Sequence, residues 1–387
     1  MIYLDNAATS GTKPKSVVNA VNTALIQYSS NPGRAGHKLS QNCAEEIYKC
    51  RKEVASFFGA NDVTSVIFTP NCTQSINYVL KGELKSGDHV IVSSLEHNAV
   101  MRPLYELSKL GVEADAAEVI FGDDDATVRT FKNLIKPNTK LIFCTHASNV
   151  FGNVLPIEKI GQICKERGIN FGVDAAQTAG VLEIDMQKDN IDYLCIAPHK
   201  GLYAPMGTGI LVANKPISKT IIEGGTGTDS IIAKQPDDLP ERLESGTQNV
   251  PGIFGIRAGV EFVNEKGINN LYRKELGLCR NCYAMLSKIK DVVLYTPMPE
   301  AYKFVPTLSF NLKDVDSTEV AELLNKKGVC VRAGLHCAPS AHRRMGTLQN
   351  GTVRVSFSAY NKQEDVQAFC KAVYDISAHT RKNKYFY

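Results

Sequence analysis

Helical and strand-like hydrophobic patterns alternate along the first two thirds of the chain. Amphipathic stretches, with apolar residues three or four positions apart, are separated by short apolar runs bounded by turn residues. The helical stretches are residues 15–28, 43–58, 74–80, 101–110 and 157–167. The strand-like runs are residues 63–68, 89–92, 141–145, 170–173, 193–196 and 209–212. This alternation predicts an α/β fold with a largely parallel sheet that carries helices on both faces.

The pattern changes after residue 255. Long helical periods and strand-like runs then follow in the order 260–290, 307–312, 317–327, 352–358 and 362–376, of which the second and fourth are strand-like. This texture is typical of a smaller α+β domain. Because 387 residues exceed the usual domain size of about 100 to 200 residues, two domains are expected. We predict a large domain at residues 15–255 and a small domain formed by residues 1–14 and 256–387.

Composition narrows the class of protein. Hydrophobic residues make up 43% of the chain and charged residues 22%, which is the balance of a folded globular protein. A net charge of +4 is too small to indicate a nucleic-acid surface. The chain also contains no run of about 18 apolar residues, which is the length needed to span a membrane. The N-terminus has no signal-peptide pattern, so a cytoplasmic location is expected.

The cysteines do not form a disulfide framework. Eleven of them, an odd number, are scattered through predicted helices and strands, so reduced thiols are expected. The single Cys-x-x-Cys motif, Cys279 to Cys282, lies in a helical stretch without a second pair, so no metal site is expected. We assign ten cysteines to buried apolar packing and single out Cys337.

Lys200 and Asp174 are the first candidates for chemistry. Lys200 follows a mostly apolar run in Ala197-Pro198-His199-Lys200-Gly201, and Asp174 follows the preceding strand-like run. A lysine amine can form a Schiff base with the aldehyde of pyridoxal phosphate, while a carboxylate opposite the pyridine nitrogen keeps that nitrogen protonated. Taken singly, Lys200 could be a surface lysine and Asp174 a helix cap. Together they predict a pyridoxal phosphate site.

Other polar residues follow strand-like runs at the same edge of the predicted sheet. Cys72 and Thr73 lie where a strand meets a helix, and the free N–H groups of a helix start can hold a phosphate dianion. Thr73 could equally be an ordinary helix cap. The imidazole of His97 could stack on the pyridine ring or be structural. The amide of Asn149 could bond to the cofactor's phenolic oxygen or form a local turn.

A second chemical feature is a glycine-bearing loop that presents Cys337. The segment Arg332-Ala333-Gly334-Leu335-His336-Cys337-Ala338-Pro339 places one thiol beside a histidine, with Arg332 and Arg354 as nearby cations. Positive surroundings favour the nucleophilic thiolate. Cys337 is therefore a candidate nucleophile.

The motifs together resemble those of the class V aminotransferase-fold cysteine desulfurases. The resemblance runs in order from residue 3 to about residue 376 and includes Leu4-Asp5-Asn6-Ala7-Ala8-Thr9, Glu96-His97, Asp174-Ala175-Ala176-Gln177, His199-Lys200, Glu244-Ser245-Gly246-Thr247 and the Cys337 loop. The short spacing of seventeen residues between Cys337 and Arg354 is similar to that of group II, which includes the SufS-like enzymes and selenocysteine lyases. It implies the type I fold of pyridoxal phosphate transferases, with a mostly parallel seven-stranded sheet, and a homodimer.

The resemblance also implies roles for individual residues. The cofactor-binding residues would be Cys72, Thr73, His97, Asn149, Asp174, Gln177, His199, Lys200 and Thr247, the last from the other subunit. The substrate-binding residues would be Asn149, Arg332 and Arg354, with Arg354 as a bidentate clamp on the substrate carboxylate. The catalytic residues would be Lys200 as the base, His97 on the ring and Cys337 as the nucleophile, carried by the small domain.

Two positions depart from the family pattern. The family often has a serine two residues before the His-Lys pair, where this chain has Ala197, so one phosphate hydroxyl is missing. Relatives commonly have Arg-Gly-Thr-Thr-Glu where this chain has Pro70-Asn71-Cys72-Thr73-Gln74. Phosphate binding is therefore expected to depend more on Thr73, the Cys72 backbone and Thr247.

Several functions follow from these residues. The first is a cysteine desulfurase that converts L-cysteine to L-alanine and carries the sulfur as a persulfide on Cys337. The alternative is a selenocysteine lyase acting on L-selenocysteine at the same site. A transaminase would leave the loop cysteine without a role, and a catalytically inactive scaffold would not require Lys200, Asp174 and Cys337 together. A sulfur or selenium acceptor protein is expected as a partner, but the sequence does not identify it.

Overall fold

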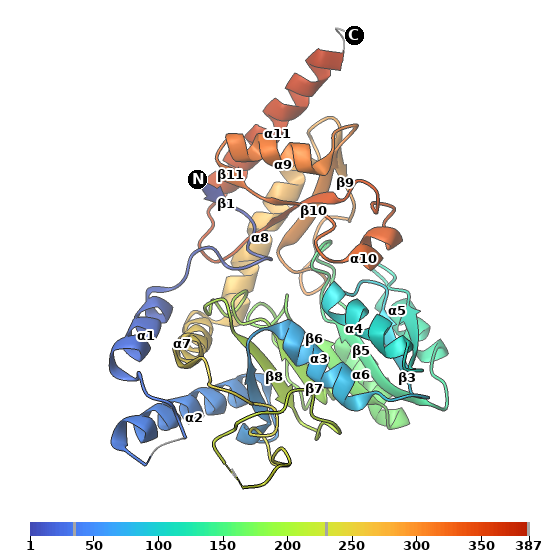
Figure 1. Cartoon of the computed structure of the whole chain (residues 1–387). Helices are drawn as coiled ribbons and strands as arrows, with labels where there is room; N and C mark the ends of the chain where they lie inside the picture. Colours follow the sequence, from blue (N-terminus) through green and yellow to red (C-terminus); the bar gives the residue numbers. More distant parts are fainter. Residues whose placement is uncertain (34–35, 229–230, 385–387) are drawn as a thin grey trace.

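The computed structural model describes residues 1–33, 36–228 and 231–384, and its largest element is a seven-stranded sheet (Figure 1). The strand order is β2-β8-β7-β6-β5-β3-β4. The strands are β2 (Val66–Thr69), β3 (His89–Ser93), β4 (Glu113–Ala117), β5 (Thr139–Thr145), β6 (Asn170–Asp174), β7 (Tyr193–Ile196) and β8 (Gly209–Ala213). Four of the neighbouring pairs are parallel, and only β8 runs antiparallel to its neighbours β7 and β2. The predicted mostly parallel α/β sheet is confirmed.

Helices cover both faces of this sheet, because alternate residues of each strand point to opposite sides. The helices are α1 (Lys15–Gln27), α2 (Lys38–Phe58), α3 (Cys72–Glu83), α4 (Asn98–Ser108), α5 (Asp124–Asn133), α6 (Ile157–Arg167) and α7 (Val250–Lys266). In β5, for example, Ile142 packs in one core with α2, α5, α6 and α7. Its neighbours Leu141 and Phe143 pack in a second core with α3 and α4. The period-two pattern of the strands thus places two cores around one sheet.

The C-terminal third forms a smaller α+β unit with its own core. A four-stranded antiparallel sheet has the order β12-β13-β10-β9, and β1 pairs with β11 in a separate two-stranded sheet. The strands are β1 (Ile2–Tyr3), β9 (Val292–Leu294), β10 (Thr307–Leu312), β11 (Val329–Cys330), β12 (Arg332–Gly334) and β13 (Thr352–Ser356). The helices are α8 (Ile268–Leu286), α9 (Ser317–Lys326), α10 (Pro339–Arg344) and α11 (Gln363–Lys384). Figure 1 shows α9 and α11 on the side of this unit that faces away from the large sheet.

Two local expectations need correction. The helical period at residues 260–290 is two helices, because Gly267 has a φ of +78° and ends α7 before α8 begins. The strand β4 and the helix α5 were not expected, since Glu113–Ala117 consists only of alanine and acidic residues and forms a strand by pairing with β3 at the sheet edge. The division into domains stays a prediction, and helix α7 runs across residue 255.

Each of the eleven cysteines, all within the described residues, is a free thiol. Nine are buried and Cys337 is exposed, whereas Cys330 is only half-buried, which corrects the expectation that ten are buried. Cys279 and Cys282 pack in the core of the smaller unit. Among the described helices, none combines the length and the hydropathy that crossing a bilayer would require.

Candidate active site

The carboxyl ends of five strands meet at one edge of the seven-stranded sheet. β3, β5, β6 and β7 are parallel neighbours, and β2 points the same way because both β2 and β7 are antiparallel to β8. The segments that follow these strands therefore leave the sheet at one edge. They carry the predicted residues Cys72, Thr73, His97, Asn149, Asp174, Gln177, His199 and Lys200.

Asp174 ends β6 with one carboxylate oxygen paired and the other open. Asp174 is only 5% exposed. Oδ1 accepts the N–H of Ala176 at 2.9 Å and the thiol of Cys72 at 3.7 Å. No hydrogen-bond partner is found for Oδ2 among the described residues. Burial raises the pKa of Asp174, and the bond from Ala176 and the charge of Lys200 oppose that rise. A cationic N–H placed at Oδ2 would stabilise the carboxylate.

Lys200 begins the segment after β7 and interacts electrostatically with Asp174. Burial lowers the pKa of the Lys200 amine, and Asp174 and Cys72 partly offset that effect. A lowered pKa increases the share of neutral amine, which is the form that attacks a carbonyl or removes a proton. The sequence prediction that Lys200 and Asp174 share one site therefore agrees with their position.

His97 lies at the N-cap of α4 in a fixed tautomer. Its Nδ1 accepts the N–H of Ala99 at 3.0 Å, so the proton of the neutral ring sits on Nε2. Burial, together with the charges of Lys200 and Arg332, lowers the pKa of His97 to about 4. At neutral pH the ring is uncharged, with one N–H available to the site.

The start of α3 has the features of an anion site. Asn71 caps the helix, because its Oδ1 accepts the N–H of Gln74 at 2.9 Å, so the alternative that Thr73 is the cap is wrong. The first-turn N–H groups of Cys72 and Thr73 have no helical partner, and the helix dipole favours negative charge there. Nearby, the buried Nδ1 of His199 has no partner among the described residues. Burial lowers the pKa of His199 to about 4.

Two further ionisable groups at this edge, the half-buried Lys13 and the buried Glu96, were assigned no role from the sequence. Lys13 donates to Ser10 Oγ at 2.6 Å and to the carbonyl of His199 at 3.0 Å, and burial lowers its pKa to about 8. Glu96 accepts from Ser93 and from the N–H of Thr145, which ties the ends of β3 and β5 together. No local pattern indicates the role of Lys13, because its partner His199 is 186 residues away.

Cys337 reaches this edge from the smaller unit. Its thiol is exposed and lies 3.7 Å from Nη2 of Arg332. Its carbonyl accepts the N–H of Asn98, the first residue of α4, at 2.7 Å. Asn98 follows His97 directly, so the backbone of the Cys337 loop lies next to the start of α4. The structure brings the Cys337 loop, Arg332 and His97 to the same edge, and their roles stay a prediction.

Arg354, on β13, is 1% exposed and partly paired. Nη2 donates to Asp5 Oδ1 at 2.6 Å, and Nη1 donates to the carbonyl of Asn149 at 2.9 Å. The buried Nε has no partner among the described residues. The Asp5 ion pair was not expected from the sequence, since the two residues are 349 positions apart.

Gln177 and Thr247 have fewer contacts with the other candidate site residues. The Nε2 of Gln177 donates to the carbonyl of Ala7 at 3.1 Å. Thr247 is exposed and lines a cavity of about 150 Å³ with Pro70 and Gln74, which flank the start of α3. Within the described residues of one chain, it has no hydrogen bond to Thr73 or His199. Its place in a partner's phosphate site stays a prediction.

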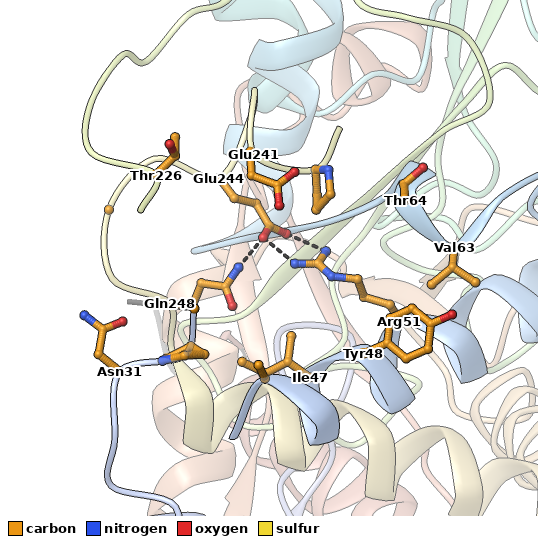
Figure 2. A pocket seen from close by; sticks show the side chains of 15 residues that line it. Asn31, Ile47, Tyr48, Arg51, Val63, Thr64, Thr226, Glu241, Glu244 and Gln248 are labelled. Carbon is orange, nitrogen blue, oxygen red and sulfur yellow. Dashed lines mark hydrogen bonds and ion pairs between the residues drawn. The ribbon is translucent and has the colours of Figure 1, made fainter. Parts of the chain in front are cut away.

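A buried ion pair fixes the segment that carries Thr247. Figure 2 shows Arg51 of α2 facing Glu244, with Gln248 bonded to the same carboxylate. The side chains of Arg51 and Glu244 are 8% and 4% exposed, and Glu244 also accepts the N–H of Phe68 at 2.6 Å. The cavity of about 320 Å³ in this view is separate from the candidate site, since none of the predicted site residues lines it.

Replacing Arg51 by methionine should lower the free energy of unfolding by about 3 to 5 kcal/mol, because it leaves a buried carboxylate unpaired. The double variant Arg51→Met, Glu244→Leu should recover part of that loss. Urea unfolding of both variants measures this. The exposed pair Glu106 and Lys109 is the control, where Glu106→Gln should cost less than about 1 kcal/mol. Equal costs at the two pairs would contradict the prediction.

A small polar cavity of about 40 Å³ lies beside Lys200. It is lined by Gln177, Ser356, Tyr203 and Glu275 among others, and it has room for a water molecule or two. Glu275 accepts the hydroxyl of Tyr203 at 3.0 Å, and burial raises its pKa to about 8. This carboxyl is neutral at pH 7 behind the candidate lysine.

Glu275→Gln should become more stable relative to the original protein as pH rises from 5 to 8. The carboxyl holds its proton in the folded state up to about pH 8, while the unfolded chain loses it near pH 4.3, so rising pH favours unfolding through this group only in the original protein. The difference should grow by at most about 1.4 kcal/mol per pH unit. Urea unfolding across this range tests it, with the exposed Glu265→Gln as the control. A pH-independent difference would contradict the prediction.

The residues at this edge fit pyridoxal phosphate. A protonated pyridine nitrogen needs an acceptor, and Asp174 has an open Oδ2. A phosphate dianion needs donors, which the first N–H groups of α3 and the unpartnered His199 supply. Lys200, whose pKa is lowered, follows β7, and β7 lies in the sheet between β6, which ends in Asp174, and β2, which precedes α3. The donor set matches the three polar ends of the cofactor.

Comparison with known proteins places the whole chain in one group. The family model described as aminotransferase class-V matches residues 2–369. A probable cysteine desulfurase from Pyrococcus abyssi is 33% identical over 99% of this chain and 96% of its own. A cysteine desulfurase from Haloferax volcanii is 31% identical over 96% of this chain and 88% of its own.

Solved structures give the same result. The apo structure of a cysteine desulfurase from Thermococcus onnurineus has a TM-score of 0.90 and 32% identity, with 98% of this chain and 95% of that chain covered. The cysteine desulfurase CsdA from Escherichia coli has a TM-score of 0.85 and 27% identity, with 98% and 94% covered. The fold is the type I fold of pyridoxal phosphate transferases, as predicted. A family model that spans nearly all of the sequence, over a site with these donors, shows that the chain belongs to the class-V aminotransferase family.

Proposed function

We propose that the protein is a pyridoxal phosphate-dependent cysteine desulfurase that converts L-cysteine to L-alanine and carries the sulfur on Cys337. The observation that carries this proposal is the position of the Cys337 loop, whose carbonyl is bonded to Asn98 beside His97 at the Lys200 edge of the sheet. A transaminase does not need a thiol there. The names of the similar proteins support the same substrate.

The bound cofactor, which class-V aminotransferases use, withdraws electrons from the substrate Cα. Thr73 and His199 would hold its phosphate, with Thr247 of the second subunit, while Asp174 would accept from its ring nitrogen. Asn149 and Gln177 would contact its phenolic oxygen, and His97 would stack on the ring. These residues orient the reacting atoms and leave Cys337 facing the substrate.

The chain's own groups divide the remaining work. Arg354 binds the substrate carboxylate through its guanidinium, whose buried Nε has no partner among the described residues, assisted by Arg332. Lys200 removes the Cα proton and returns a proton to the product. The Cys337 thiolate attacks the substrate sulfur, so an S–S bond forms as the C–S bond breaks. The products are alanine and a Cys337 persulfide, which balances the atoms.

The test of this function is product analysis. Purified protein with pyridoxal phosphate, L-cysteine and a thiol reductant should yield alanine and sulfide in equal amounts without any keto acid. A parallel reaction with L-selenocysteine tests the selenocysteine lyase alternative. A requirement for a keto acid would identify a transaminase, and a preparation that stays colourless with pyridoxal phosphate would identify an inactive scaffold.

We further propose a group II enzyme that acts as a cytoplasmic homodimer and passes sulfur to an acceptor protein. The short interval between Cys337 and Arg354 supports the subgroup. The exposed Thr247, which has no hydrogen bond within its own chain to the phosphate-binding residues, supports the dimer. Light scattering tests the dimer, and a pull-down with the persulfide form of the enzyme tests for an acceptor.

A further inference from the structure

Asn149 is bonded on two sides, and the two bonds lead to different parts of the proposed site. Its backbone carbonyl accepts from Arg354 Nη1 at 2.9 Å. Its side-chain Nδ2 donates to the carbonyl of His336 at 2.8 Å. His336 directly precedes Cys337. One residue of the turn after β5 therefore contacts both the arginine proposed to bind the substrate carboxylate and the loop of the proposed nucleophile.

The loop that Asn149 contacts has an unfavourable backbone conformation. His336 and Cys337 have φ values of +48° and +57°, in the left-handed region that side-chain-bearing residues seldom adopt. Two consecutive residues of this kind persist only where surrounding contacts hold them. The contacts here are specific and few, and they can be named.

The backbone and ring of this strained pair make hydrogen bonds to three other segments, and the Cys337 thiol also lies 3.7 Å from Nη2 of Arg332 on β12. The imidazole of His336 is 2% exposed, and its Nε2 bonds to the carbonyl of Thr352 at 2.9 Å, which anchors the loop to β13. The carbonyl of Cys337 accepts from Asn98, which anchors it to α4. The carbonyl between these anchors, that of His336, is held by the Asn149 side chain. Of the three, only the Asn149 bond comes from a residue that also touches Arg354.

We propose that Asn149 is a positioning residue that holds the Cys337 loop against the large sheet and transmits occupancy of Arg354 to that loop. A carboxylate bound at Arg354 fixes the guanidinium and with it the carbonyl and the side chain of Asn149. The amide then fixes the carbonyl of His336 and the direction of the Cys337 thiol. This inference rests on the proposed function, because Arg354 is assigned to the substrate carboxylate there.

The role is distinct from a contact with the cofactor. The amide of Asn149 has two N–H groups, of which one is engaged by His336, so the second can still point to a phenolic oxygen. Side-chain variants of Asn149 keep the backbone carbonyl that Arg354 uses. They therefore cut the link on the loop side only, which makes the inference testable with single substitutions.

The experiment measures alkylation of Cys337 by iodoacetamide in the holoenzyme, read by peptide mass spectrometry, without turnover. Asn149→Ala and Asn149→Asp should each change the Cys337 rate about fivefold without ligand, which is the effect of losing one hydrogen bond. His336→Phe, which removes the bond to Thr352 and does not touch the cofactor in this proposal, should change the rate similarly with the cofactor absorbance unaltered. The half-buried Cys330, labelled in the same samples, controls for unfolding and should keep its rate.

Saturating L-alanine, the proposed product without sulfur, then tests the transmission. It should change the Cys337 rate severalfold in the original protein and by less than twofold in both Asn149 variants. Unchanged rates in the Asn149 variants without ligand, or an equal effect of alanine in them, would overturn the inference. If alanine alters neither the cofactor absorbance nor the labelling of the original protein, the proposed substrate site fails, while the labelling without ligand still decides the role of Asn149 in holding the loop.

Discussion

Lys200→Ala should reduce cysteine turnover by roughly ten thousandfold, because it removes both the covalent attachment of the cofactor and the base at the substrate Cα. The same change should abolish the yellow absorbance band that forms with pyridoxal phosphate. Absorbance spectra and alanine release measure the two effects. Both losses have one cause, because the same Lys200 amine is proposed to attach the cofactor and to act as the base. Burial lowers the pKa of this amine, and Asp174 interacts with it.

The matched control is Lys200→Arg, which keeps the positive charge opposite Asp174 and Cys72. A guanidinium stays protonated and cannot act as the nucleophile or base, so this variant should fold like the original protein and remain inactive. Full activity in either variant, with an unaltered absorbance band, would contradict the assignment of Lys200.

Cys337→Ala should reduce cysteine turnover at least about a hundredfold, since no other exposed thiol lies at the site within the described residues. The cofactor band should be retained, because Cys337 has no role in holding the cofactor. Alanine release from L-cysteine and L-selenocysteine, measured side by side, tests the change. A desulfurase should lose the cysteine reaction far more than the selenocysteine reaction.

Two further variants serve as comparisons for this prediction. Cys337→Ser keeps the size of the side chain but offers a hydroxyl that does not accept sulfur, so it should behave like the alanine variant. Cys330→Ala removes the half-buried thiol on β11 and should leave turnover unchanged. Cysteine activity that survives in Cys337→Ala would show that the persulfide role belongs elsewhere.

The arrangement of the large sheet could be predicted well because its central strands are short, continuous apolar runs. Residues such as Leu141, Ile142 and Phe143 are apolar on both faces, which is the pattern of a strand buried between two layers of helices. β4 lacked that pattern because it lies at the edge and takes its conformation from its bonds to β3. Strands at an edge depend on their neighbours, so local sequence is a weaker guide to them.

Some residues of the candidate site could likewise be predicted from the sequence, and others could not. Residues at the end of a strand or shortly after it, such as Asp174, Lys200 and His97, could be placed together because the carboxyl ends of parallel strands meet at one edge. Lys13 and Glu275 could not be, because each reaches this edge by packing from a helix or a loop with no motif of its own.

The sequence by itself determined which side chains are available for the chemistry and the edge of the sheet where most of them lie. The tertiary structure alone decided how they are held, through Asp5 on Arg354, Asn98 on Cys337 and the amide of Asn149 on His336. These bonds join residues from 187 to 349 positions apart, as between Asn149 and His336 or Asp5 and Arg354. Hydrophobic periodicity encodes which face of an element is buried, whereas a hydrogen bond depends on where the ends of separate elements meet after packing.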